Sequence, residues 1–518
     1  MSHNFSQIPR ADIPRSSFDR SHGYKTTFDA GYLIPFYVDE ALPGDTFNCS
    51  ATLFGRLATP IAPFMDNCFL DVHYFAVPMR LVWDNWQRFN GEQPNPGDST
   101  DFLIPQIVSP ASTGWVVGSL SDYFGLPTQV VGLSVSSLWH RAYNLIWNEW
   151  FRDENLQDSV SVPTGDGPDA NSLFSLLRRG KRHDYFTSCL PWPQKGPGVE
   201  LPLGTSAPVK FKAQPNAWYV VEASNGVHHG AVSQLYESAA STFINNAGGY
   251  NAALDPNGGL YTDLSSATAA TINSLRQAFQ LQRLYERDAR GGTRYTEILR
   301  AHFGVTSPDA RLQRPEYLGG SSNRIHVNPV QQTSSTDSTS PQGNLAAFGT
   351  VGANGTGFIK SFTEHTLIIG LCSVRADLTY QQGVNRMWSR QTRFDFYWPA
   401  LAHLGEQAVL NKEIYAQGTA ADDAVFGYQE RYAEYRYYPS QITGKFRSTY
   451  AQSLDVWHLS QEFASLPALN ATFIVDDPPF DRVIAVPSEP HMLLDVFMNL
   501  RCARPMPVYG VPGLVDHF

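Results

Sequence analysis

The sequence predicts a mainly β protein, an antiparallel β-sandwich with long, partly helical insertions between its strands. Several segments alternate apolar and polar residues with the period of two that a half-buried strand requires. These segments are separated by tens to more than a hundred residues, and no internal repeat relates them. Evenly spaced hairpins of a simple barrel or propeller are therefore excluded.

Three segments give the clearest strand signals. Cys68–Ala76 alternates strictly, and His491–Arg501 places Met492 and its alternate neighbours on one face. Thr366–Val374 is a continuous apolar run, which is typical of a strand buried on both faces. Further strand candidates lie within Tyr32–Val77, Trp218–Glu222 and Phe426–Tyr438.

Residues 1–30 are predicted to form an extended N-terminal arm, because Pro9 and Pro14 exclude a helix and basic residues are spaced along it. A frayed terminus is the alternative. Residues 31–518 are expected to form a single domain with four interruptions. These are a helical insertion at 80–196, a surface protrusion at 197–270, an amphipathic helix at 271–292 and a flexible, low-complexity loop at 320–358.

Two helices are expected inside the insertions. Ser136–Asn155 is apolar nearly all round and holds three tryptophans, so it must be buried within the subunit or between subunits. The helix beginning at Thr271 is amphipathic. Its expected apolar face carries Leu275, Ala278, Phe279 and Tyr285.

Composition limits the class of protein. The 518 residues include 40 Gly, 35 Pro and only 17% charged residues, which excludes a coiled coil, a helical repeat array or a disordered chain. No apolar run reaches the length of a membrane helix, and the polar N-terminus has no signal-peptide character, so no membrane insertion is expected. The five cysteines are far apart and form no CxxC pair, which predicts reduced, mostly buried thiols and a reducing cytoplasm.

Charge adds a further indication. The net charge is −10, and 30 of the 38 basic residues are arginines. Arginine and aromatic residues are enriched at interfaces, whereas lysine mainly solvates surfaces. The pattern is typical of a protein whose surface is largely covered by partners.

Signatures of enzymes are mostly missing, so no catalytic residue, metal site or cofactor is expected. Gly180-Lys181 and Gly444-Lys445 lack the Ser or Thr of a P-loop, and the glycines of 352–357 have the wrong spacing for a dinucleotide site. His228-His229 are predicted to lie in a polar loop, and the pairs Asp422-Asp423 and Asp476-Asp477 in turns. Cys189 is expected to be a buried thiol, although His183 nearby leaves a nucleophile and base as an alternative.

Two basic features are candidate nucleic-acid contacts. Arg276, Arg283, Arg287 and Arg290 fall within about 60° of one another on a helix, and Arg294 continues the stripe. The second feature is the cluster Arg178, Arg179, Lys181 and Arg182. Either could follow phosphates, pair with carboxylates of a neighbouring subunit or simply be solvated.

Four segments resemble the major capsid proteins of small single-stranded DNA phages, the Microviridae. They are RAYNLIWNEWFRDENLQ at 141–157, HDYFTSCLPWPQKG at 183–196, LPGDTF at 42–47 and FAVPMRLVWDNW at 75–86. The long insertion after Gly196 is similar to that of the gokushovirus branch.

This resemblance implies an eight-stranded viral jelly roll, sixty copies of which close a T=1 shell around a circular single-stranded DNA genome. The insertion at 197–270 would be a surface protrusion, with Asn225, His228, His229 and Asn257 as candidate receptor contacts. The implied partners are the chain itself, the genome, a small basic DNA-binding virion protein, a minor or pilot protein, a scaffolding protein and a host surface receptor. The expected location is the virion, assembled in the cytoplasm of a bacterial host.

Electrostatics sets a condition on such a shell. Sixty copies at −10 bring about −600 charges around a polyanion, so the inner face must be locally basic or other cations must enter. A β-sandwich that binds or cleaves carbohydrate is the alternative, suggested by the Trp, Tyr and paired Asp residues.

Overall fold

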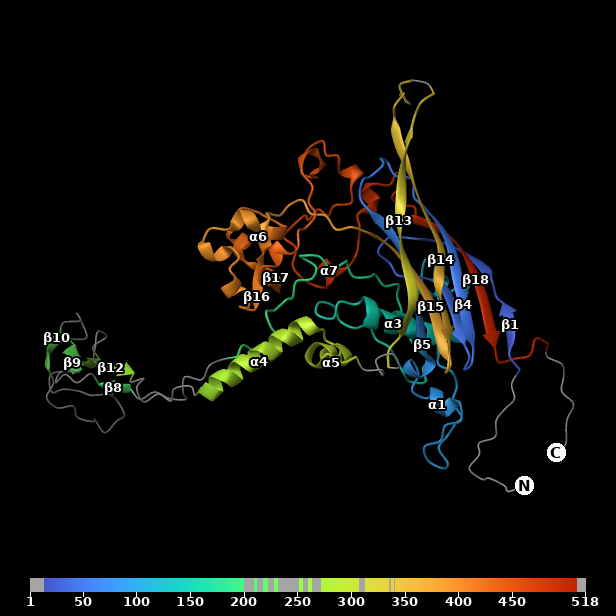
Figure 1. Cartoon of the computed structure of the whole chain (residues 1–518), viewed down its shortest axis with the longest axis horizontal. Helices are drawn as coiled ribbons and strands as arrows, with labels where there is room; N and C mark the ends of the chain where they lie inside the picture. Colours follow the sequence, from blue (N-terminus) through green and yellow to red (C-terminus); the bar gives the residue numbers. More distant parts are fainter. Residues whose placement is uncertain are drawn as a thin grey trace. The chain divides into compact units, whose positions relative to one another are not determined.

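The computed structural model describes residues 14–199, 209–211, 218–221, 228–231, 251–254, 260–262, 272–306, 313–334, 337–339 and 341–509 (Figure 1). The chain divides into two compact units. One consists of Met1–Pro193 together with Gly291–Phe518, and the other of Gln194–Arg290. The single domain expected after residue 30 is thus divided, and the smaller unit contains the predicted protrusion and most of the amphipathic helix.

The larger unit is built on one curled, antiparallel sheet of nine strands. They follow the order β1-β18-β4-β14-β13-β5-β15-β3, and β2 also pairs with β18. The sheet curls because β13 pairs with β14 through its C-terminal half and with β5 through its N-terminal half. The strands are β1 (Ser16–Asp19), β2 (His22–Phe28), β3 (Ile34–Ala41), β4 (Thr46–Leu57), β5 (Cys68–Pro78), β13 (Glu316–Gln331), β14 (Leu345–Ser361), β15 (Thr366–Ala376) and β18 (Met492–Arg504).

The main core lies between the two halves of this sheet, as in a jelly-roll sandwich. Strand β18 shows the predicted alternation: Met492, Leu494 and Val496 are buried, and the residues between them are exposed. They belong to the same apolar cluster as Leu70 and Val72 of β5. Each such side chain, fully buried, stabilises the fold by about 1.5–3 kcal/mol. The predicted mainly β sandwich is confirmed.

A second core covers the other face of β5 and β15. Leu367 and Ile369 of β15 pack in one cluster with Trp83, Leu138 and Tyr143 of the helical insertion. Every residue of β15 is therefore buried, as its unbroken apolar sequence predicts. The insertion contains α1 (Trp86–Phe89), α2 (Leu120–Tyr123), α3 (Leu138–Ile146) and the short strands β6 (Gln106–Val108) and β7 (Ser134–Ser136).

The predicted tryptophan-rich helix is shorter than expected. Helix α3 ends at Ile146, a π-helical turn follows over Trp147–Phe151, and Trp147 is buried. The segment also buries a charged residue. The guanidinium of Arg141 is fully buried, and it donates two hydrogen bonds to Asp169, at 2.6 and 2.8 Å, which compensate its charge.

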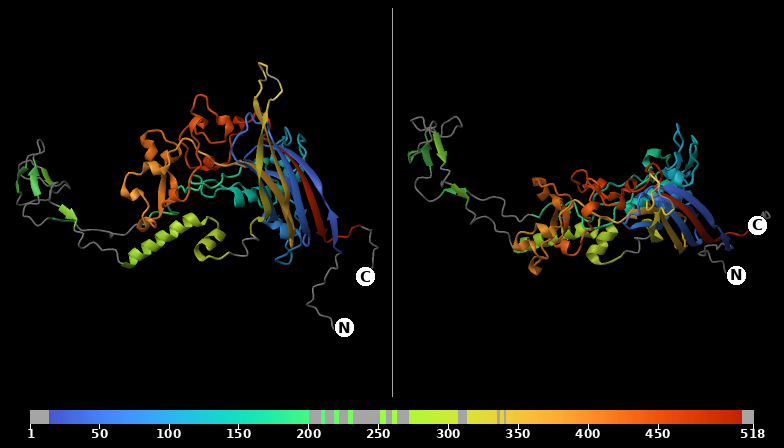
Figure 2. Two further views of the ribbon diagram at one scale, coloured as in Figure 1. Left: turned by 45° about the horizontal axis from the view of Figure 1, so that its top comes forward. Right: turned by 90° about the horizontal axis from the view of Figure 1, so that it is seen from above.

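A third apolar cluster forms a lobe beside the sandwich (Figure 2). It contains β16 (Glu406–Leu410), α6 (Asn411–Ile414), β17 (Val425–Glu430) and α7 (Ala471–Ile474). The predicted strand Phe426–Tyr438 is wrong beyond Glu430. Tyr432 adopts a left-handed conformation with φ of 63°, and a 3₁₀ turn follows, which ends the strand.

The predicted flexible loop at 320–358 is also wrong. Most of it forms β13 and β14, whose paired ends extend as a two-stranded ribbon beyond the rest of the sheet (Figures 1 and 2). Small residues are needed here for close packing rather than for mobility. At Gly357, in the segment 352–357, a Cβ atom would lie 1.9 Å from the carbonyl oxygen of Cys49 on β4.

The described part of the predicted N-terminal arm joins the sheet. Strands β1 and β2 both pair with β18. Between them, Arg20 forms a two-pronged ion pair with Asp39 of β3, at 2.7 and 3.0 Å. Residues 1–13 lie outside the described residues.

The smaller unit contains short strands and one long helix. Strand β9 pairs with β10 and β11, and β8 pairs with β12. Their bounds are β8 (Val209–Phe211), β9 (Trp218–Val221), β10 (His228–Ala231), β11 (Asn251–Leu254), β12 (Leu260–Thr262) and α4 (Ile272–Gly291).

All five cysteines are free and buried, in agreement with the sequence prediction. Burial raises the pKa of the Cys49 thiol to about 12, so it is inert as a nucleophile. Cys189 lies buried with its thiol directed at the carbonyl of Tyr185. In the parts of the chain that the structure describes, no helix has both the length and the apolar character needed to cross a bilayer.

Candidate functional site

The basic cluster at 178–182 lies in an extended segment held between two other parts of the chain. The backbone N–H of Arg179 donates to Gly31 at 2.9 Å, and that of Lys181 donates to Ile474 at 2.7 Å. Gly31 permits this approach, because a Cβ atom there would lie 2.1 Å from the carbonyl oxygen of Asp476. The segment therefore joins the N-terminal strands to the third lobe.

Arg179 binds inside the subunit, on the carboxylate of Asp71. Asp71 accepts hydrogen bonds from Arg179 at 2.7 Å, from Arg375 at 2.6 Å and from Ser322 at 2.6 Å. Burial alone would raise the pKa of Asp71. The Ser322 hydrogen bond and the two guanidiniums outweigh burial and hold that pKa below its usual range. The three donors tie β5, β13 and β15 to the 178–182 segment.

Lys181 is buried, and its ammonium donates to the carbonyl of Phe473 at 2.6 Å and to Gln461 at 3.1 Å. Burial lowers its pKa to about 8. The two remaining members of the cluster lie nearer the surface. Arg178 pairs with Asp477 at 2.5 Å, and Arg182 pairs with Asp377 at 3.3 Å.

Arg294 is neutralised in a similar way. It forms ion pairs with Glu149 at 3.0 Å, Glu297 at 3.1 Å and Glu154, and donates to the carbonyl of Asn148 at 2.8 Å. It also precedes α5 (Tyr295–Phe303), where Glu297 accepts from its backbone N–H. Arg294 therefore joins the helical insertion to α5. It belongs to the larger compact unit, whereas residues 272–290 of α4 belong to the smaller one.

The arginine stripe of α4 has a different environment. Arg276, Arg283 and Arg287 are exposed, and Arg290 is half-buried. On the expected apolar face, Leu275, Ala278 and Tyr285 are partly buried, but Phe279 is 65% exposed, which contradicts its predicted place in that face. DNA contact by the stripe stays a prediction.

The receptor-contact residues stay predictions as well. His228 and His229 open β10, where their backbones pair with Val221 and Val220 of β9. The polar loop predicted for the two histidines is therefore a strand. Asn225 and Asn257 lie outside the described residues.

The predicted turn role of the paired aspartates is confirmed at Asp422, whose carboxylate accepts the backbone N–H groups of Gln417 and Gly418. The turn predicted for Asp476 and Asp477 is wrong, because the chain there is extended and the backbone N–H of Asp476 donates to Arg179 at 2.9 Å. Burial raises the pKa of Asp476 to about 7, although Arg179, Lys181 and Arg375 oppose this rise.

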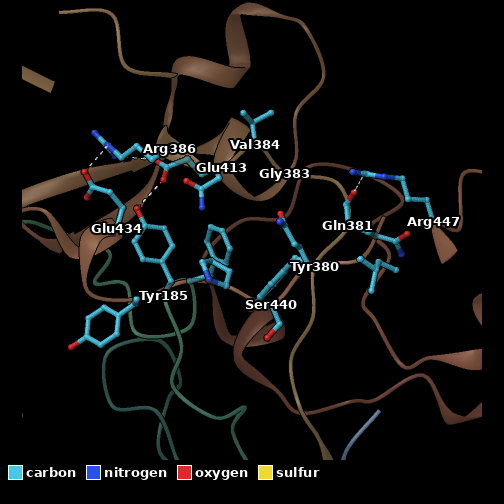
Figure 3. Close-up of a pocket in the computed structure, with 16 residues that line it drawn as sticks. Tyr185, Tyr380, Gln381, Gly383, Val384, Arg386, Glu413, Glu434, Ser440 and Arg447 are labelled. Carbon is cyan, nitrogen blue, oxygen red and sulfur yellow. Dashed lines mark hydrogen bonds and ion pairs between the residues drawn. The ribbon is translucent and has the colours of Figure 1, made fainter. Parts of the chain in front are cut away.

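A buried ionic network in the third lobe was not predicted from the sequence (Figure 3). Arg386 donates to Glu413 at 2.9 Å, and Tyr185 donates to the other oxygen of the same carboxylate at 2.8 Å. Glu434 lies 3.9 Å from Arg386 and 3.5 Å from Arg390. Tyr185, Arg386, Glu413 and Glu434 border a cavity of about 40 Å³, a volume that suits a few waters and is far smaller than an organic ligand requires.

The network fixes the loops that carry it. Burial raises the pKa of Glu413, whereas the charge of Arg386 opposes this effect. Its members are up to 249 residues apart in sequence, from Tyr185 to Glu434, so no local spacing could have indicated them. We assign it a structural role in positioning residues 386–398 and 431–447.

Comparison with known proteins places the whole chain in one family. A family model described as "Capsid protein (F protein)" matches residues 6–514. The capsid protein VP1 of Bdellovibrio phage phiMH2K is 53% identical, over all of this chain and 98% of the relative. The VP1 proteins of Chlamydia phage 1 and Spiroplasma virus 4 are 47% and 40% identical, each over 99% of this chain and at least 97% of the relative.

These matches favour a structural coat role over the carbohydrate alternative. They run through the sandwich, the helical insertion and the third lobe alike, so the similarity is not limited to one shared fold element. The chain belongs to the capsid protein (F protein) family.

Proposed function

We propose that this chain is the major coat subunit of a small icosahedral phage of the Microviridae, and that sixty copies close a T=1 shell around a circular single-stranded DNA genome. The observation that carries the proposal is the end-to-end match to phage capsid proteins, at up to 53% identity. The role is structural, and the virion is assembled in the cytoplasm of the bacterial host. The buried, free thiols are compatible with a reducing compartment.

An exposed apolar surface on the large sheet supports self-association. Phe54 of β4 and Leu493 and Phe497 of the neighbouring β18 are each about half exposed. They lie on the face turned away from the sandwich core, opposite Leu53, Leu494 and Val496 in the alternation. A grouped apolar surface of this kind marks an interface. A neighbouring copy would remove these side chains from water.

Genome contact is the second part of the proposal. An acidic shell around DNA needs local basic surface, and the exposed arginines of the α4 stripe remain available for it. The 178–182 cluster and Arg294 contribute less, because carboxylates of the same chain already balance them. A small basic virion protein would supply further cations, with a minor or pilot protein and a scaffolding protein as other partners.

The insertion at 197–270 is proposed to contact a host surface receptor. The test is deletion of residues 226–259 in an infectious phage. Particles of normal mass that no longer attach to cells would support the role. Loss of soluble coat protein would contradict it, because the segment would then be needed for folding.

Sedimentation velocity with negative-stain imaging, in reducing buffer, tests the coat function directly. Sixty copies of 57.6 kDa give a particle of about 3.5 MDa. Closed particles, or smaller rings that mature into them, are the expected result. A stable monomer that binds oligosaccharides would contradict the proposal and favour the carbohydrate alternative.

A further inference from the structure

Two loop segments of the third lobe form a surface rich in aromatic and basic residues. We call residues 386–398 and 431–447 the aromatic-basic surface. Together they contain seven Arg or Lys residues and two acidic residues, a net charge of +5 within a chain of −10. Residues 391–400 are exposed without interruption, although four of them are aromatic. Eight aromatic side chains are at least 42% exposed: Trp388, Phe394, Phe396, Tyr397, Trp398, Tyr435, Tyr437 and Tyr438.

The two segments pack against each other. The backbone N–H of Tyr397 donates to the Tyr435 hydroxyl at 3.4 Å, and the rings of Tyr397 and Tyr432 lie 5.1 Å apart. The buried carboxylate of Glu413 pairs with Arg386 (Figure 3). Glu434 pairs with Arg390, which lies in the same segment as Arg386. Contacts within the subunit thus position Tyr397 and Tyr435 relative to each other.

Guanidinium groups lie over the faces of two of the exposed rings. Arg390 is 4.2 Å from the centre of the Tyr435 ring, and Arg393 is 4.8 Å from that of Trp398. Each guanidinium covers one face of its ring, and Tyr435 and Trp398 remain 50% and 42% exposed. Unpaired nucleic acid is bound by this combination, because bases stack on aromatic faces while cations meet the phosphates.

We infer that the aromatic-basic surface binds single-stranded DNA, stacking unpaired bases on its exposed rings. The inference rests on the proposed coat function, which requires the subunit to meet a polyanion. It also follows from the charge distribution of the described residues. The cluster at 178–182 and Arg294 are neutralised within the chain. On the aromatic-basic surface, Glu413 and Glu430 from outside the two segments pair with Arg386 and Arg436, and an excess of +3 remains. A second copy of the chain is the competing occupant, since interfaces are also enriched in arginine and aromatic residues.

The test uses the full chain, a fluorescein-labelled oligodeoxythymidylate and fluorescence anisotropy. The variants are Trp388→Ala with Phe394→Ala, whose side chains are 76% and 63% exposed, and Arg393→Gln. The matched controls are Tyr295→Ala with Phe303→Ala on α5, both 73% exposed, and Arg56→Gln on β4. Trp388→Phe is a conservative variant that keeps a ring.

Stacking on one ring changes affinity by at least about fivefold, so loss of both rings should weaken binding by about 25-fold or more. Arg393→Gln should reduce the slope of log K against log salt by about 0.7, the value for one phosphate contact on a single strand. The controls should bind as the wild type does, and Trp388→Phe should retain most of the affinity. A duplex hairpin should bind weakly, because its bases are already stacked.

Sedimentation of the same preparations separates the outcomes. Wild-type particles without oligonucleotide binding would overturn this inference and leave the coat function standing. Oligonucleotide binding by a chain that never assembles would support the DNA-binding surface and contradict the coat function. Ring variants that lose particles but keep DNA affinity would assign the surface to a second copy. Tighter binding of oligouridylate than of the DNA probe would overturn the assignment to DNA.

Discussion

Replacing Asp71 with alanine should destabilise the unassembled subunit by about 4 kcal/mol. Arg179 and Arg375 both donate to the same oxygen of Asp71, at 2.7 and 2.6 Å, and both guanidiniums are at most 15% exposed. Removing one partner of a buried ion pair costs about 3–5 kcal/mol, because an uncompensated charge stays in the interior. Here two charges would remain, facing each other across the vacated site.

Asp377 provides a matched control for this prediction. Its carboxylate lies 3.3 Å from Arg182 and 3.8 Å from Arg375, but it is 35% exposed. Asp377→Ala should therefore cost less than about 1 kcal/mol. Combining Asp71→Ala with Arg179→Ala should cost less than the two single changes together, by about 1 kcal/mol or more, since the pair is coupled.

Urea unfolding of the unassembled chain, followed by tryptophan fluorescence, measures these differences. A loss of about 4 kcal/mol is a large part of the 5–15 kcal/mol that stabilises an ordinary domain, so a lower yield of soluble protein is also expected. An Asp71→Ala variant within about 1 kcal/mol of the wild type would refute the reasoning. Equal costs for Asp71 and Asp377 would refute it too, because burial would then not determine the cost.

Three further predictions concern pH, genome contact and packing. Burial raises the pKa of Asp476 to about 7, against about 3.9 in the unfolded chain. Between these two values the folded state holds a proton that the unfolded state releases. The free energy of unfolding therefore falls as the pH rises from about 4 to about 7. Asp476→Asn should remove that fall, gaining up to about 4 kcal/mol relative to the wild type over this range; parallel curves of stability against pH would contradict it. Replacing Arg283, Arg287 and Arg290 of the α4 stripe with glutamine should lower the DNA content of particles, while shells still form. The ratio of absorbance at the nucleic-acid and protein bands measures that content. An unchanged DNA content would make the stripe structural or solvated. Gly357→Ala should cost about 1–3 kcal/mol or more in thermal unfolding, because its Cβ would meet the carbonyl of Cys49, whereas Gly352→Ala has open space and should fold normally.

Periodicity in the sequence identified the main strands because burial alternates locally. The apolar positions of β18 and the unbroken run of β15 each follow from which faces are covered, and both appear in the structure as expected. The prediction of a flexible loop at 320–358 was wrong because the conformation there depends on distant strands. The segment's Ser, Thr and Gly residues resemble a loop in composition, and their strand conformation depends on pairing with β4 and β5, more than 240 residues away.

The basic cluster at 178–182 shows the same limit for the site. A local run of arginine and lysine looks like a surface for phosphates when only the run is considered. Its partners Asp71, Asp377 and Asp477 lie from 108 to 299 residues away, and only the fold brings them together. The aromatic-basic surface was likewise hidden, since its two segments are separated by strands of the third lobe. Candidate sites built from long-range contacts cannot be predicted from one sequence by spacing alone.

The strong preference for arginine over lysine also has a second explanation. It first suggested a surface covered by partners, yet several arginines act within the subunit. Arg20, Arg141 and Arg179 each join segments distant in sequence through carboxylates that are at most 7% exposed. A planar guanidinium can donate in two directions at once and remains charged when buried, whereas the buried Lys181 has its pKa lowered to about 8. Arginine is therefore suited to holding long insertions on a sandwich frame, and the positive charge left for a nucleic-acid partner is better sought where aromatic rings, rather than carboxylates, surround it.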